Sequence, residues 1–151
     1  MNRIALLAWK KIVFTFFCLL FLQCSKNNIE RNPFLPELRF SVPVNLNLPQ
    51  YDNLRYAGGS VLLPQYGHHG ILVFNLNGST YLAWEASCPN HLPNNCSQTE
   101  LQGVLSVCRC EDYQYSLATG QLLNPPSNSE RFYSLINYQV SPQGSSLVIS
   151  N

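Results

Sequence analysis

The stretch that decides the fold is SCPNHLPNNCSQTELQGVLSVCRCEDYQYSLATGQ, residues 87–121. It contains two short cysteine boxes, Cys88-Pro-Asn-His91 and Cys108-Arg-Cys110-Glu111, with Cys96 between them. Cysteine, histidine and carboxylate side chains are common protein ligands of metal ions, so the boxes predict a metal site or the remnant of one. Zinc-ribbon and rubredoxin-like sites use Cys-x-x-Cys in both loops, and neither box has that spacing.

The N-terminus indicates the compartment in which these cysteines work. Three basic residues precede an apolar run, Ile12–Leu22, that suits a signal peptide and is too short for a comfortable transmembrane helix. The run ends in Phe-Leu-Gln-Cys24-Ser, which resembles a bacterial lipobox, although Gln23 replaces the usual small residue. We expect residues 1–23 to be a lipoprotein signal peptide and Cys24 to carry the lipid. The alternative is an uncleaved N-terminal anchor, and both place the rest of the chain outside the cytoplasm.

Removal of the signal peptide changes the charge and the cysteine count. The whole chain has nine Lys+Arg and eight Asp+Glu, and residues 1–23 hold three of the bases and no acid. Six bases against eight acids give the mature chain a net charge of −2, without the basic patch that nucleic acid binding needs. Four cysteines remain beyond Cys24, and in an oxidising compartment their default state is two disulfides.

The mature chain divides into a tether and one domain. Residues 24–38 are polar and rich in Asn and Pro, which predicts a tether between the lipid and the fold. Residues 39–151 are enough for one small domain and too few for two. The sequence has no convincing helix of ten residues, no repeat of fixed period and no glycine-rich phosphate loop.

The domain has the pattern of an all-β fold. Phe40–Leu48 alternates apolar and polar residues, and Pro43 within it predicts an edge strand. Asn77-Gly78 predicts a hairpin turn between the strands Ile71–Leu76 and Thr80–Glu85. Further short strands are expected at Ser60–Leu63, Val104–Val107, Tyr113–Leu117, Tyr133–Val140 and Ser146–Ile149. Many short strands with regular turns are typical of a small sandwich or barrel.

Together, the strands and the two boxes resemble the Rieske iron–sulfur domain family. The resemblance covers Gly70–Val140 and includes the strand hairpin, both boxes, the segment Tyr115–Gly120 and Pro125. In that family each of two loops gives one cysteine and one histidine to a [2Fe–2S] cluster, with both cysteines on one iron and both histidines on the other. A further cysteine on each loop forms a disulfide that ties the loops together. The resemblance implies a small domain of short antiparallel strands with two cysteine-bearing loops.

The resemblance also implies a ligand set, which this chain matches in part. Cys88 and Cys108 match the ligand cysteines, and His91 approximates the first histidine, although it stands one residue farther from Cys88 than in the family. Glu111 occupies the position of the second histidine, and Asp112 replaces the glycine that follows it. A carboxylate is a harder, anionic donor than imidazole, so a cluster bound here would have a lower potential.

The resemblance implies the cysteine pairing as well. Cys96 and Cys110 match the disulfide pair, and we expect that bridge whether or not a metal is bound. Cys88 and Cys108 would then pair in a metal-free protein, since ligation and a disulfide use the same sulfurs.

Two functional hypotheses follow. The sequence favours a cluster-free domain with two disulfides, no cofactor, no enzymatic activity and a binding or structural role. The alternative is an electron-transfer protein with a variant [2Fe–2S] cluster at Cys88, His91, Cys108 and Glu111. We expect lipid anchoring in a bacterial cell envelope in both cases, with a redox or envelope protein partner that the sequence does not name.

Other readings of the same residues stay open. A zinc site could use all four cysteines, one cysteine could act as a nucleophile, or His68 or His69 could supply the missing ligand. His91 could instead be a polar loop residue that caps its own turn.

Overall fold

The computed structural model of the chain describes residues 31–127 and 131–151. The predicted signal peptide, the predicted lipid site at Cys24 and the first part of the predicted tether lie outside the described residues. The described residues form β-strands and one short 3₁₀-helix, η2 (Pro49–Arg55). The strands are β1 (Ser41–Asn45), β2 (Ser60–Leu63), β3 (Ile71–Asn75), β4 (Tyr81–Glu85), β5 (Glu100–Gln102), β6 (Leu105–Val107), β7 (Gln114–Ser116), β8 (Asn137–Gln143) and β9 (Ser146–Ser150). Within these ranges no helix is long and apolar enough to cross a membrane.

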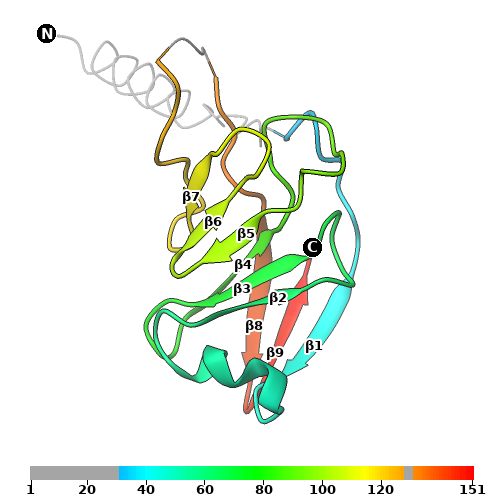
Figure 1. Cartoon of the computed structure of the whole chain (residues 1–151). Coiled ribbons are helices and arrows are strands. Elements are labelled where there is room, and N and C mark those ends of the chain that lie inside the picture. The colour runs from blue at the N-terminus through cyan, green and yellow to red at the C-terminus, as the bar shows by residue number, and fades with distance from the viewer. Residues whose placement is uncertain (1–30, 128–130) are drawn as a thin grey trace, which may run out of the picture. The chain divides into compact units, whose positions relative to one another are not determined.

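The larger sheet is antiparallel and has six strands in the order β1-β9-β8-β4-β3-β2 (Figure 1). Strand β8 joins its two halves, because Asn137 and Tyr138 pair with β4 while the rest of the strand pairs with β9. Pro43 lies in β1, at the edge of this sheet, as the sequence predicts. Its missing N–H therefore removes no bond between two central strands.

The first core lies on one face of the larger sheet. Strand β3 is buried on both sides, and its alternate residues Ile71 and Val73 face this core. Apolar residues from both halves of the sheet meet them, and Leu54 of η2 covers them. This core holds the six strands together through apolar burial, which contributes about 25 cal/mol for each Å² removed from water.

The second core packs the smaller sheet, β5-β6-β7, against the other face of β3 and β4. Leu72 and Phe74 of β3 face this core, because successive strand residues point to opposite sides. Trp84 also lies in it, and its indole N–H donates to the Leu117 carbonyl at 2.8 Å. The smaller sheet, which carries the second cysteine box, is thereby fixed to the hairpin that leads to the first.

The prediction of an all-β fold with two cysteine-bearing loops on short antiparallel strands is confirmed. Strand β5 is a difference, since none of the expected strands covers Glu100–Gln102. The expected strand Tyr133–Val140 is another, because β8 begins only at Asn137. Residues before β8 bond to other segments: Tyr133 N–H donates to Asn90 Oδ1, and Leu135 N–H donates to the Gly120 carbonyl.

The last part of the predicted tether packs on the domain. Leu35 is only 2 % exposed, and Phe34 makes an edge-to-face ring contact with Tyr133. The Asn32 amide donates to the Pro89 carbonyl at 2.7 Å, next to the first cysteine box. The compact unit that contains the strands spans Asn32–Asn151. Apolar residues at positions 34 and 35 within a polar stretch are the signal for this docking.

Candidate functional site

The first cysteine loop, residues 88–96, is closed at its base by backbone hydrogen bonds. Cys88 N–H donates to the Ser97 carbonyl, and Thr99 N–H donates to the Ala86 carbonyl, both at 2.8 Å. Inside the loop, Asn94 Oδ1 accepts from Cys96 N–H at 2.9 Å, which replaces backbone pairing by a local turn. The loop thus has a defined shape before any sulfur or metal is considered.

The second cysteine loop is the turn between β6 and β7. Cys108 N–H donates to the Tyr113 carbonyl at 2.8 Å, and the residues between them form the turn. Asp112 has a φ of +57°, in the left-handed region that favours glycine. Aspartate tolerates this region better than most residues that carry a Cβ.

Two disulfides join the loops. Cys88 pairs with Cys108, with Cα atoms 5.6 Å apart, and Cys96 pairs with Cys110 at 5.4 Å. These are the pairs that the resemblance implies for a metal-free chain. Cys88 and Cys108 are fully buried in the second core, whereas Cys96 and Cys110 are partly exposed. The disulfides therefore form an inner and an outer bridge.

Two further donor side chains converge on the inner bridge. His91 Nε2 lies 3.8 Å from Cys108 Sγ and 3.5 Å from Glu111 Oε2. Glu111 Oε2 lies 2.9 Å from Cys108 Sγ. Ligand atoms of Cys88, His91, Cys108, Cys110 and Glu111 all lie within 4.8 Å of one another. The structure thus brings together the four residues that the sequence named as a metal set, and adds Cys110.

The orientation of the His91 ring is set by its backbone neighbour. His91 Nδ1 lies 2.8 Å from the Leu92 carbonyl oxygen, which only accepts hydrogen bonds, so Nδ1 carries the hydrogen. The other ring nitrogen, Nε2, faces the sulfur of Cys108 and the carboxylate of Glu111. Metal-binding histidines commonly have this arrangement, with one ring nitrogen on a carbonyl and the other on the ion.

The donor set does not fit a two-iron cluster in this arrangement. In a [2Fe–2S] centre of the Rieske type the cysteine and histidine donors are on different irons, so two metal ions and their bridging sulfides separate them. Here the imidazole nitrogen stands beside the Cys108 sulfur, as two neighbours on a single ion would stand. The remaining donor is Glu111, a hard carboxylate that suits an iron–sulfur centre poorly.

Hydrogen bonds from Asn90 hold the first loop against the rest of the domain. Asn90 donates to the Tyr115 hydroxyl at 2.8 Å and makes two bonds with the Tyr133 backbone. Burial in the second core raises the pKa of Tyr115 far above its ordinary value, so its hydroxyl stays protonated. Sequence reasoning gave Asn90 no role, and its place between Cys88 and His91 was the only signal.

His68 and His69 do not join this site. Their backbone N–H groups donate to the carboxylate of Glu85, which is fully buried. The His68 ring bonds the Pro36 carbonyl at 2.8 Å, and the His69 ring lies 3.1 Å from the Ser87 hydroxyl. Both are engaged in fixing their own turn, and among the described residues neither belongs to the group of converging donors.

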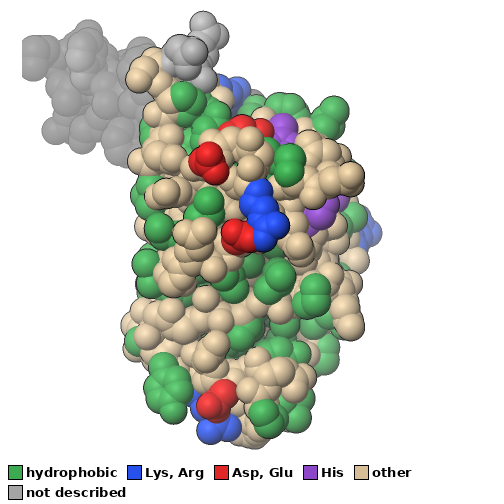
Figure 2. Space-filling model, viewed as in Figure 1, with side chains coloured by type: hydrophobic (Ala, Val, Ile, Leu, Met, Phe, Trp, Pro, Cys, Tyr) green, Lys and Arg blue, Asp and Glu red, His purple; other side chains and the backbone are tan. Residues whose placement is uncertain are grey.

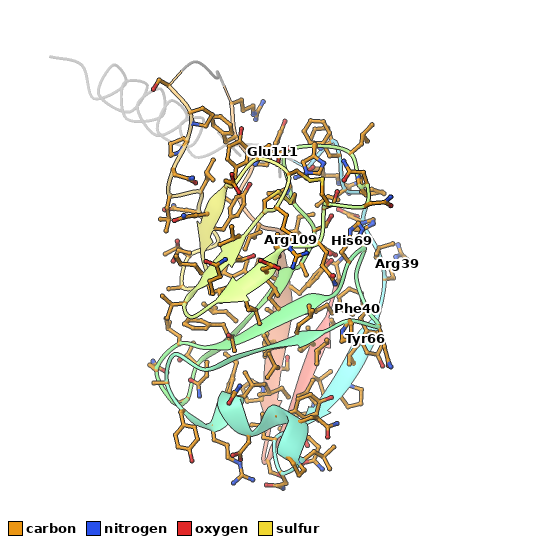
Figure 3. All side chains as sticks on the ribbon, viewed as in Figure 1. Arg39, Phe40, Tyr66, His69, Arg109 and Glu111 are labelled. Atoms are coloured by element: carbon orange, nitrogen blue, oxygen red, sulfur yellow. A yellow bond between two sulfur atoms is a disulfide. The ribbon has the colours of Figure 1, made fainter. Side chains whose placement is uncertain are left out.

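Figure 3 shows Glu111 at the tip of the second loop, while His69 lies on a separate loop near the start of β3. Charged and histidine side chains gather around the cysteine-loop end of the face in Figure 2. They include the surface ion pair of Arg109 with Glu100, which joins the second loop to β5.

Comparisons with known proteins give a fold likeness alone. No family model matches this sequence, and no curated protein matches it significantly. A solved structure described as a complex of reduced oxygenase and oxidized ferredoxin in carbazole 1,9a-dioxygenase contains a similar chain, with 15 % sequence identity and a TM-score of 0.47. The match covers 76 % of this chain and 94 % of the other. A likeness of this degree assigns neither family nor function.

Proposed function

We propose that this protein is a lipid-anchored bacterial envelope protein whose Rieske-like domain is closed by two disulfides and works as a binding or structural module without a cluster. The observation that carries the proposal is the inner bridge. Cys88 and Cys108, the two sulfurs that a cluster would need, are bonded to each other and fully buried.

The bridges can replace the cross-link that a cluster would provide. The inner bridge closes a segment with a sequence separation of 20, which contributes about 3 kcal/mol in the chain-entropy model. That is a large share of the roughly 5–15 kcal/mol by which small domains are stable. A chain that has lost its cluster would therefore retain rigid loops as long as the compartment is oxidising.

The stapled loops present one large apolar side chain to a partner. Leu92 at the end of the first loop is 69 % exposed, although it is a large apolar side chain. It follows His91, whose ring Nδ1 is hydrogen-bonded to the Leu92 carbonyl. A rigid loop loses little conformational entropy on binding, so an exposed leucine at this position supports a binding role for this end of the domain.

The test is a joint analysis of bridges and metal in the full-length chain purified without oxygen. Peptide mapping under non-reducing conditions is expected to give Cys88–Cys108 and Cys96–Cys110, and iron and sulfide analysis is expected to give neither element. Iron with equal sulfide, together with alkylatable thiols at Cys88 and Cys108, would instead establish the electron-transfer alternative. A Cys88–Cys96 bridge would contradict the overlay of the loops on the Rieske pattern.

A further inference from the structure

We propose that breaking the inner bridge converts the same residues into a site for one divalent transition-metal ion of the zinc class. The ligands are Cys88, Cys108, His91 and Glu111. This inference rests on the proposed function, since its starting state is the stapled chain without a cluster. The inference adds a second, metal-binding state of the site. This state forms only where the surroundings are reducing enough to break the inner bridge.

Two of the three distances among Cys108, His91 and Glu111 are those of donors that share one ion. Zinc binds sulfur at about 2.3 Å and nitrogen or oxygen at about 2.0–2.2 Å, so tetrahedral neighbours stand roughly 3.3–3.8 Å apart. His91 Nε2 lies 3.5 Å from Glu111 Oε2 and 3.8 Å from Cys108 Sγ. The contact between Glu111 Oε2 and Cys108 Sγ, at 2.9 Å, has to lengthen by about 0.6 Å to match.

The fourth donor is the sulfur of Cys88, which has to move away from the sulfur of Cys108. The two sulfurs of the inner bridge are bonded, and a disulfide holds its sulfur atoms about 2 Å apart. Two thiolates on one tetrahedral zinc ion stand about 3.8 Å apart. Reduction therefore has to open this pair by about 1.8 Å, while His91 and Glu111 already lie at nearly the right distance from Cys108.

The chemistry balances with a dithiol or phosphine as reductant. A dithiol supplies two electrons and two protons and becomes a disulfide, whereas a phosphine becomes its oxide and water supplies both the oxygen and the two protons. In either case the sulfur–sulfur bond breaks and each cysteine takes up one proton. A divalent ion then displaces both protons as it binds the two thiolates. Nε2 of His91 and the Glu111 carboxylate complete the set of four ligands.

The donor types select the class of ion. Two soft thiolates exclude Mg²⁺ and Ca²⁺, which need oxygen ligands, and favour Zn²⁺ and ions that mimic it. The ion can enter from the surface, because Glu111 is the exposed member of the set while the cysteines are buried. Cys110 also lies in the cluster, so the experiment must separate it from the proposed ligands.

The experiment uses the full-length chain in detergent, without a histidine tag, and Co²⁺ as a spectroscopic stand-in for zinc. Cys96→Ser/Cys110→Ser serves as the background, because it leaves the inner pair as the only thiols of the two loops. After phosphine reduction without oxygen, we expect one Co²⁺ per chain, with tetrahedral ligand-field bands and sulfur-to-cobalt charge transfer that Zn²⁺ abolishes. The unreduced protein is expected to show none of these bands.

Substitutions of the partly exposed ligands identify them without disturbing the core. His91→Gln and Glu111→Gln are each expected to weaken Co²⁺ and Zn²⁺ binding at least tenfold in the reduced background, as loss of a ligand does. Asp112→Asn is the matched control, since it removes the neighbouring carboxylate, which is not in the donor group, and it is expected to bind as the background does. Circular dichroism before titration checks that each variant is folded.

The possible failures are distinguishable. Absence of binding by the reduced background, or binding that His91→Gln and Glu111→Gln leave unchanged, would overturn the single-ion site while the mapped disulfides and the proposed function stand. Iron and sulfide in the chain as isolated would overturn the proposed function itself. Octahedral bands without charge transfer would show that the thiols do not ligate, and would also overturn the site.

Discussion

At the scale of single residues, Asp112 bears a conformation that its side chain disfavours. Among the described residues it is the one non-glycine residue with a positive φ, +57°. We expect Asp112→Gly to raise the free energy of unfolding by about 0.5–1 kcal/mol, because glycine has no Cβ to clash in this region. Urea denaturation measures the change.

The control for this prediction is Asp112→Ala, which keeps a Cβ and removes the carboxylate. It is expected to lower stability, because alanine tolerates the left-handed region less well than aspartate. Equal losses in the glycine and alanine variants would contradict the prediction and would show that the Asp112 carboxylate contributes a contact of its own.

Glu85 is a buried residue whose carboxylate is fully satisfied. It accepts hydrogen bonds from the backbone of His68, His69 and Ser87 and from the Tyr138 hydroxyl at 2.7 Å. Glu85→Gln would place amide N–H groups against some of these donors, so we expect a loss of about 2–3 kcal/mol in the free energy of unfolding. The matched control is Glu100→Gln, whose ion pair with Arg109 lies at the surface and is worth less than about 1 kcal/mol. Similar losses in the two variants, measured by urea denaturation, would rule out this account.

At the scale of elements, the turn after β7 depends on contact with β4. A Cβ at Gly120 would lie 2.5 Å from the Trp84 ring, and the residue has a φ of +71°. Gly103 has a similar φ of +62°, but nothing within 4 Å of an added Cβ. Gly103→Ala should therefore suffer only backbone strain, about 1 kcal/mol, while Gly120→Ala should lose about 3 kcal/mol or more.

Thermal unfolding of the two glycine variants isolates the contact between the elements, since the strain is nearly common to both. Tryptophan fluorescence adds an independent readout, because only Gly120→Ala should disturb the surroundings of Trp84. Equal shifts of the melting temperature in both variants would contradict a tight contact between this turn and β4.

Elements with local signals were predictable from the sequence, and those built on distant contacts were not. Asn77-Gly78 located the hairpin of β3 and β4 because its turn chemistry is local. Strand β5 has only three residues, Glu100–Gln102, and forms through pairing with β6 rather than from its own pattern. Tyr133 lies outside a strand, and its N–H donates to Asn90 Oδ1, 43 positions earlier in the sequence. No local pattern reveals a contact between residues so far apart.

The candidate site was predictable to a similar extent. The two boxes identify the four donors, but only the fold shows that His91 turns its Nε2 toward Cys108 while Nδ1 faces a carbonyl. The distance between His91 Nε2 and Cys108 Sγ, which distinguishes a single-ion site from a two-iron cluster, also depends on how the loops fold. The sequence also does not show which disulfide is buried, because all four residues are cysteines in similar polar loops. The structure shows that the inner bridge is buried and the outer one is partly exposed.

At the scale of the whole molecule, each of the two cores contains a buried tyrosine. Burial raises the pKa of Tyr115 in one core and of Tyr138 in the other, and the neighbouring Glu85 carboxylate raises that of Tyr138 further. A raised pKa in the folded state means that folding favours the protonated phenol. The stability that this contributes is complete below pH of about 10, the ordinary tyrosine pKa, and is lost as pH rises toward the folded values.

We therefore expect the free energy of unfolding to fall steadily above pH of about 10. Ultraviolet titration should show that Tyr115 and Tyr138 ionise only as the protein unfolds. Tyr56→Phe is the control, since Tyr56 is exposed and its loss should leave this pH dependence unchanged. Ionisation of all eight tyrosines in one step while the circular dichroism stays native would contradict the burial argument.

The proposed membrane attachment concerns the whole chain and would depend on one sulfur, that of Cys24. Acyl chains contribute about 0.8 kcal/mol per buried CH₂, so loss of the lipid is expected to remove the anchor. We expect Cys24→Ala to lose the label in metabolic labelling with a fatty acid and to leave a soluble or unprocessed protein. Cys18→Ala, which changes the other cysteine of the N-terminal segment, should keep both label and membrane fraction. Label retained by Cys24→Ala would refute the lipobox, whereas an unlabelled wild-type chain in the membrane fraction would indicate an uncleaved anchor.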